Sequence, residues 1–86
     1  MNISLTKPDS VVEVTAIGVR FSDDRVYVRL SDGREIGVPL QRLPWLQNAT
    51  GAERESWAIE PHGIAVYWND LDDGLEVVHL LDRQPL

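Results

Sequence analysis

Residues 17–38, IGVRFSDDRVYVRLSDGREIGV, have the most regular apolar pattern in this chain. Apolar and polar residues alternate along this stretch, and a period of two is typical of β-strands with one buried face. A tight turn centred on Asp23 and Asp24 brings apolar residues of two strands opposite one another. The expected pairs are Phe21 with Val26, Val19 with Val28 and Ile17 with Leu30. We therefore predict an antiparallel hairpin whose six apolar side chains share one buried face.

The second turn of this stretch sets the register of a third strand. Asp32-Gly33 resembles a two-residue type I′ hairpin turn, but that register would place the apolar Leu30 opposite Glu35. A three-residue loop, Ser31 to Gly33 with Gly33 left-handed, instead gives the pairs Val28 with Ile36, Val26 with Val38 and Arg29 with Glu35. The last of these is a cross-strand ion pair on the solvent face. We predict a three-stranded meander with this loop.

The alternation of apolar residues before the meander has the opposite phase to that of the first strand. Val12, Val14 and Ala16 alternate out of step with residues 17–21. An extra residue in the strand would reconcile the two patterns, and Gly18 suits such a position. We expect a β-bulge or bend around residues 16–18.

Short helical turns follow the meander. Leu40, Leu43 and Leu46 recur every three residues, and Pro44 should divide them into two short turns rather than one helix. Thr50 and Glu53 then have the spacing of a capping box, which predicts a short helix over about residues 51–56.

The last third of the chain predicts a second hairpin and a C-terminal helix. A turn at His62-Gly63 gives the pairs Trp57 with Trp68, Ile59 with Val66 and Ala58 with Tyr67. Asp73-Gly74-Leu75-Glu76 reads as a second capping box, with Leu75, Val78 and Leu81 on one face of the helix that follows. The predicted fold is therefore α+β: a small antiparallel sheet, made of a three-stranded meander plus a second hairpin, with two or three short helices. We expect a single domain over residues 1–86 with an ordered core of about residues 10–82.

Composition restricts the classes of function. The net charge is −6, from 14 acidic and 8 basic residues, and Lys7 is the single lysine. Nucleic-acid binding needs clustered cations, so we expect no direct binding of nucleic acid and a preference for basic partners. There is no cysteine, no signal peptide and no apolar run long enough for a membrane span. These features predict a cytoplasmic protein that does not bind membranes.

The acidic loop from Asn69 to Asp73 is the first candidate for a ligand site. Aligning Gly74 with the conserved turn position of a calcium loop places Leu71 and Leu80 at ligand positions, and neither can ligate. Asp73 as a helix N-cap accounts for the same residues. Neither His62 nor His79 has a nucleophile or carboxylate at motif spacing. We therefore predict no catalytic residue, no metal site and no cofactor, and we expect that the chain is not an enzyme.

Aromatic and arginine side chains are the remaining candidates. We expect Trp57 and Trp68 to form a cross-strand core pair. Trp45 follows a proline in an irregular turn close to Arg42, where either core packing or partial exposure is consistent with the pattern. On the outer face of the first hairpin, Arg20 beside Tyr27 predicts a stacked pair. The candidate partner-contact residues are Arg42, Trp45, Tyr27 and Arg20.

The order of several short motifs resembles a small bacterial family known as domain of unknown function 2442. The motifs are Tyr27, Asp32-Gly33-Arg34, Val38-Pro39-Leu40, Leu43-Pro44-Trp45-Leu46, Asn48-Ala49-Thr50, Glu53-Arg54 and Trp57, then Gly63-Ile64, Trp68, Leu71-Asp72-Asp73 and Leu80-Leu81. The resemblance covers about residues 12–81. The chain departs from the family pattern at Trp45, where an arginine is usual, at Tyr67, where a histidine is usual, and after Asp73.

The resemblance implies an accessory or partner-binding role. Some members of the family look fused to a helix-turn-helix domain, and others are encoded beside another small protein in what resembles a toxin–antitoxin arrangement. We expect a protein-binding module whose partner is another small protein, as the acidic member of such a pair. The alternatives are a self-associating domain that dimerises through a sheet edge, and a module that binds a small ligand or regulates transcription.

Overall fold

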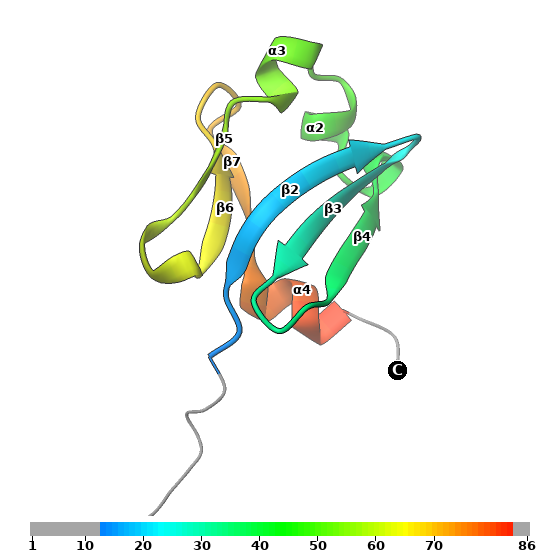
Figure 1. Ribbon diagram of the computed structural model, residues 1–86. Helices are drawn as coiled ribbons and strands as arrows, with labels where there is room; N and C mark the ends of the chain where they lie inside the picture. The colour runs from blue at the N-terminus through cyan, green and yellow to red at the C-terminus, as the bar shows by residue number, and fades with distance from the viewer. Residues whose placement is uncertain (1–12, 84–86) are drawn as a thin grey trace, which may run out of the picture.

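The computed structural model describes residues 13–83, so the expected start of the core at residues 10–12 lies outside the described residues. Two three-stranded antiparallel sheets and several short helices form the α+β fold that the sequence predicts (Figure 1). The first sheet consists of β2 (Ala16–Ser22), β3 (Arg25–Leu30) and β4 (Glu35–Pro39). The second consists of β5 (Trp57–Ile59), β6 (Ala65–Trp68) and β7 (Asp73–Glu76).

The register of the first hairpin is the predicted one except at Ile17. Phe21 pairs with Val26 and Val19 with Val28, but Leu30 faces Ala16 rather than Ile17. The register shifts between Ala16 and Gly18, which confirms the expected bulge. Ile17 is the extra residue of that bulge and is 55% exposed, so its predicted place in the core is wrong.

The second turn confirms the three-residue loop. Val28 pairs with Ile36, Val26 with Val38 and Arg29 with Glu35. Gly33 has a φ of 96°, a conformation that costs glycine little and other residues more. The Leu30 amide donates to the Arg34 carbonyl at 2.8 Å and closes the loop.

The helical segments are short. The chain passes through η1 (Leu40–Arg42) and α2 (Pro44–Gln47), which are the two turns that Pro44 was expected to separate. The helix α3 (Gly51–Arg54) begins with the predicted capping box, in which Thr50 and Glu53 each accept a hydrogen bond from the other's backbone amide. A further turn, η2 (Pro61–Gly63), joins β5 to β6. Among residues 13–83, no helix is long and apolar enough to cross a membrane.

The C-terminal region differs from the prediction. Asp73 to Glu76 does not cap a helix but forms β7, which pairs antiparallel to β6 and turns the second hairpin into a three-stranded sheet. The helix α4 (Val77–Arg83) begins at Val77 rather than directly after Asp73, the expected N-cap. Its buried residues are Val77 and Leu80, whereas Val78, which was predicted to face the core, is 66% exposed.

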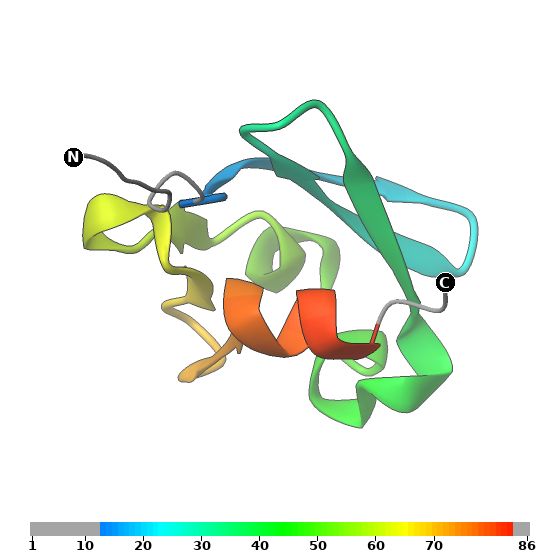
Figure 2. The ribbon, with the colours of Figure 1, turned by 90° about the horizontal axis from the view of Figure 1, so that it is seen from below.

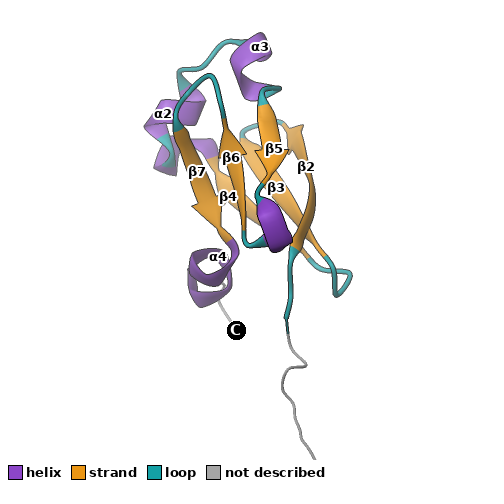
Figure 3. Cartoon of the chain, turned by 90° about the vertical axis from the view of Figure 1, so that its left-hand side faces the viewer, coloured by secondary structure: helices purple, strands orange, loops and turns teal. Residues whose placement is uncertain are grey.

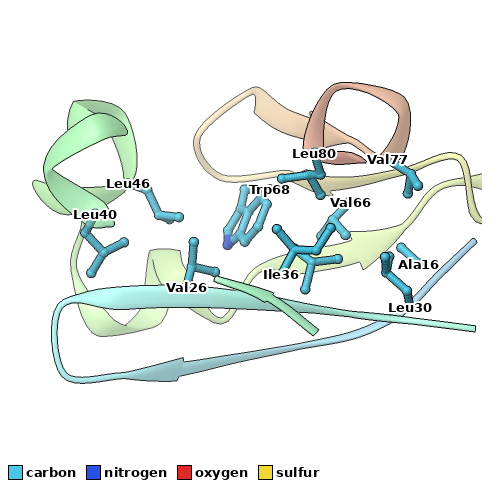
Figure 4. Packing of buried hydrophobic residues seen from close by; sticks show 11 residues of the cluster. Ala16, Val26, Leu30, Ile36, Leu40, Leu46, Val66, Trp68, Val77 and Leu80 are labelled. Carbon is cyan, nitrogen blue, oxygen red and sulfur yellow. The ribbon is translucent and has the colours of Figure 1, made fainter. Parts of the chain in front are cut away.

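The two sheets pack face to face around one core (Figures 3 and 4). Trp68 is fully buried and lies in the middle of a cluster that draws on both sheets, on η1 and α2 and on α4. The helix α4 covers the lower end of the space between the sheets, and α2 and α3 lie at the upper end (Figures 1 and 2). Strands β2 and β5 are in contact, while β4 and β7 are the outer strands at the opposite edge (Figure 3). This arrangement leaves the sandwich open along one side.

Candidate functional site

A groove of about 860 Å³ runs along that open side, between β4 and β7. Its apolar lining comes from both sheets and from the segments at either end, namely Ile36, Val38, Leu43, Trp45, Leu75 and Leu80. Apolar clefts of this size with a few polar groups at the rim are the usual form of a binding site. The groove is the candidate functional site of the molecule.

Among the strands of residues 13–83, none pairs with the edge of β4 that borders the groove. In an antiparallel pair, residues that bond to the neighbouring strand alternate with residues that do not. The Leu40 amide donates to the Asp24 carbonyl at 2.8 Å, which fixes the phase: even-numbered residues of β4 bond to β3. Glu35 and Gly37 therefore direct their N–H and C=O groups away from β3, and Pro39 directs a carbonyl alone because it has no amide hydrogen.

The edge of β7 is less open. The Val77 amide donates to the Ile64 carbonyl at 2.9 Å, so odd-numbered residues of this strand bond to β6. Gly74 and Glu76 direct their backbone groups outward. The Gly74 amide, however, donates to Oδ1 of Asp73 at 2.8 Å and is already occupied. The acidic side chains of Asp73 and Glu76 also discourage strand pairing at this edge.

Two of the four predicted contact residues line the groove. Trp45 is half-buried and packs edge-to-face against Trp68, with ring centroids 5.5 Å apart, so it belongs partly to the core and partly to the groove wall. Arg42 is exposed at the end of η1, beside the same wall. The structure thus brings Trp45 and Arg42 together at one end of the groove.

The charges around the groove differ between its two ends. Arg25, which pairs with Pro39 at the end of β4, and Arg42 give the end near α2 two cations. At the end near α4, Ala65 of β6 lies between Glu60, which directly follows β5, and Glu76 of β7. There, Nδ1 of His79 lies 3.1 Å from Oε1 of Glu76. The groove therefore has a basic end and an acidic end.

Arg20 and Tyr27, the other two predicted contact residues, lie on the outer face of the first sheet. The predicted stacked pair is confirmed, because the Arg20 guanidinium carbon lies 4.1 Å from the centre of the Tyr27 ring. Arg20 also donates two hydrogen bonds to the Glu35 carboxylate, both 2.9 Å long. A Cβ atom on Gly37 would lie 2.7 Å from Cε1 of Tyr27, so the ring covers this glycine. These contacts connect all three strands. They explain the positions of Arg20 and Tyr27 without any contact to a partner protein.

The Arg20 contact changes the protonation equilibrium of Glu35. Its hydrogen bonds hold the pKa of the Glu35 carboxyl below its ordinary value, and the nearby charges of Arg20 and Arg29 act in the same direction. The predicted pair of Arg29 with Glu35 is present but longer, at 3.8 Å. The closer contact with Arg20 was not predicted, because Arg20 lies on β2 and reaches Glu35 across β3, whereas register pairs only neighbouring strands.

The remaining candidates lie elsewhere in the structure. Asn69 to Asp72 forms the turn between β6 and β7, where the Tyr67 hydroxyl donates to the Asp72 carboxylate. Trp57 pairs with Trp68 in register, as predicted, and is half-buried. Over the described part of the chain, residues 13–83, no three His, Cys, Asp or Glu side chains gather as a metal ion would require.

Sequence reasoning missed the half of the groove that β7 and α4 provide. The sequence pattern assigns Leu75 and Glu76 to a helix, and nothing in it places them opposite β4. The one available signal was the pair of glycines Gly37 and Gly74, each of which stands directly opposite a tyrosine on the neighbouring strand. Small residues of this kind in strands often mark a close approach of another chain.

Comparisons with known proteins identify a family and a fold. Residues 16–85 match the sequence profile described as "Protein of unknown function (DUF2442)". No curated protein matches the chain. A crystal structure of a protein of unknown function from Rhodospirillum rubrum is similar, with 25% identity and a TM-score of 0.68 over 81% of this chain and 87% of that one. The solution structure of an uncharacterised protein from Chromobacterium violaceum shares the fold, with 23% identity and a TM-score of 0.68 over 79% of this chain and 64% of that one.

Proposed function

This chain belongs to the DUF2442 family, and we propose that it is a non-catalytic cytoplasmic module that binds another small protein. The groove between β4 and β7 is the binding site in this proposal. The observation that carries it is the combination of an apolar groove with a strand edge along its side that no other strand of the described part of the chain covers. Trp45 and Arg42 at one end are residue types that contribute strongly at the centres of protein interfaces.

The charge of the chain supports a protein partner with basic surface. A net charge of −6 steers association towards cations and away from phosphate. A partner that presents positive charge near Glu60 and Glu76 would complement the acidic end of the groove. We propose, more specifically, that the chain is the acidic member of a two-gene pair resembling a toxin–antitoxin pair.

The test is co-expression with the product of the neighbouring gene. We expect the two proteins to purify together and the substitution Arg42→Glu to weaken the complex. The matched control is Arg29→Glu, which makes the same charge change on the outer face of the first sheet, away from the groove lining. Loss of binding in both variants, or in neither, would contradict the assignment to the groove.

A second candidate is self-association through a sheet edge. The open edge of β4 favours it, because unpaired strand edges are templates for pairing with another copy. Light scattering over a hundredfold range of concentration distinguishes the two functions. A monomer at every concentration excludes self-association and leaves the protein-binding function in place.

A further inference from the structure

We propose that the edge of β4 receives an extended segment of the partner protein as an added strand, antiparallel to β4. The segment has an acidic residue towards its N-terminal end, a basic residue towards its C-terminal end and apolar residues at alternate positions between them. This inference rests on the proposed function and specifies the partner of the same groove.

The choice of β4 over β7 follows from their backbone groups. Gly37, in the middle of β4, directs both its N–H and its C=O away from β3, along the edge that lines the groove. The corresponding amide of Gly74 in β7 is occupied by Asp73. Peptide recognition by strand addition uses such a free edge for affinity and adjacent pockets for specificity.

The length and pattern of the segment follow from the groove. Strand β4 spans five residues, and Pro39 at its end offers no amide, so pairing stops there. A segment of about five to seven residues covers this edge at about 3.4 Å per residue. Alternate side chains of an added strand point to the same face, so every second residue meets the apolar lining formed by Leu43, Leu75 and Leu80.

For an antiparallel segment, the order of its charged residues follows from the charges at the two ends of the groove. Strand β4 runs towards η1, so the N-terminal end of an antiparallel segment lies beside Arg25 and Arg42. Its C-terminal end lies beside Glu60 and Glu76. An acidic residue at the first end and a basic residue at the second therefore complement the groove.

A second copy of this chain fits the groove less well. Pairing two β4 edges would bring together two chains that each have a net charge of −6. It would also place the acidic edge of each β7 on the side that faces the other copy. A basic partner meets neither obstacle.

The test uses synthetic peptides and the unaltered full chain. The probe is acetyl-Glu-Thr-Val-Thr-Val-Thr-Lys-amide, in which the charged and apolar residues share one face of the strand, and its matched control has Glu and Lys exchanged. Titrations followed by tryptophan fluorescence and by amide chemical shifts should show binding of the probe, with the Gly37 amide among the shifted signals. Because exposed charge contacts are individually weak, we expect the exchanged peptide to bind about five- to tenfold more weakly. Arg42→Glu should abolish this preference, and Arg29→Glu should keep it.

Backbone methylation of the probe tests strand pairing without altering the protein. Two further peptides have N-methyl groups on alternate residues, in the two possible phases. We expect one phase to lose at least about tenfold in affinity, since it removes the donors that face β4, while the other stays within about twofold. Equal effects of both phases would overturn strand addition while leaving the groove as a binding site.

Three other results separate this inference from the proposed function. If the exchanged peptide binds as well as the probe, the charge order of the segment is wrong. If no peptide binds while the neighbouring gene product still purifies with the chain in an Arg42-dependent way, strand addition is wrong and the proposed function stands. If the chain forms a dimer that the probe dissociates, the occupant of the edge is a second copy and the inference is overturned.

Discussion

At the scale of single residues, Glu35 connects the outer faces of all three strands of the first sheet. It accepts two hydrogen bonds from Arg20 on β2 and lies close to Arg29 on β3. Arg20 in turn stacks on Tyr27, whose ring covers Gly37 on β4. A cluster of charges that contact one another, together with an aromatic ring, stabilises a sheet more than an isolated surface pair does.

The substitution Glu35→Gln should make the stability of the protein less dependent on pH. The pKa of the Glu35 carboxyl is lowered in the folded state, so its contribution to stability is present above the ordinary pKa of glutamate, about 4.3. That contribution is lost as the pH falls through the lower folded-state value. The difference in urea midpoint between wild type and variant should be largest near neutral pH and shrink below about pH 4.

Urea titrations monitored by tryptophan fluorescence at several pH values measure this difference. The control is Glu55→Gln, at an exposed residue with no ion pair among residues 13–83. A constant difference between wild type and Glu35→Gln across the pH range would show that the Arg20 contact does not stabilise the fold.

Two glycines that have open space where a Cβ atom would lie should respond oppositely to alanine. Gly33 has a φ of 96°, so Gly33→Ala is strained and should cost about 1–2 kcal/mol of the free energy of unfolding. Gly51 begins α3, and Gly51→Ala should stabilise the protein by about 0.5–1 kcal/mol, because it restricts the unfolded chain. Thermal or urea unfolding of the two variants measures both changes in the free energy of unfolding. A similar effect of the two substitutions would contradict the left-handed conformation of Gly33 in the three-residue loop.

At the scale of elements, the segment Asp73 to Glu76 shows how a local signal can mislead. An acidic residue followed three positions later by glutamate has the spacing of a helix capping box. The same four residues have only one large apolar side chain, Leu75, and so carry no strand periodicity. Their hydrogen bonds go to β6, which makes them a strand and moves the start of α4 to Val77.

The register of α4 can be tested by charge substitutions at neighbouring positions. Val77 is 5% exposed and Val78 is 66% exposed. Val77→Asp buries a carboxylate and should cost about 3 kcal/mol or more, whereas Val78→Asp should change stability by no more than about 0.5 kcal/mol. Equal destabilisation by both substitutions, measured by chemical denaturation, would favour the helix register that the sequence pattern predicted.

At the scale of the whole molecule, neither sheet has a core of its own. Val26 and Val28 of the first sheet and Val66 and Trp68 of the second belong to one buried cluster, which η1, α2 and α4 complete. Each three-stranded sheet alone would expose its apolar face to water. The two sheets should therefore depend on each other for stability.

We expect the molecule to unfold in a single cooperative transition. All three tryptophans lie between residues 45 and 68, so tryptophan fluorescence reports on the second sheet and its adjoining turns. Amide signals of Tyr27 and Ile36 report on the first sheet. Urea midpoints from the two probes should coincide, and a separation beyond experimental error would mean that one sheet unfolds before the other.

Those parts of the fold that depend on contacts between neighbouring segments could be predicted from the amino-acid sequence. The register of the first meander from Val19 onwards, the loop with Gly33, the two turns around Pro44, the capping box at Thr50 and the pairing of β5 with β6 could all be predicted. In each case the apolar period and the turn residues permit one arrangement that buries every apolar side chain on the same face. The order of short motifs also predicted the DUF2442 family correctly.

The tertiary structure alone decided the bulge position of Ile17, the identity of β7 and the groove. Ile17 lies outside the core because it is the extra residue of the bulge, so that Ala16 rather than Ile17 lies opposite Leu30. Residues 73–76 form a strand because their backbone groups pair with β6. A segment of four residues does not contain enough of a pattern to predict which strand it will pair with. The same pairing brings Leu75 and Glu76 alongside β4, so the groove with Trp45 and Arg42 exists only once the two sheets have packed together.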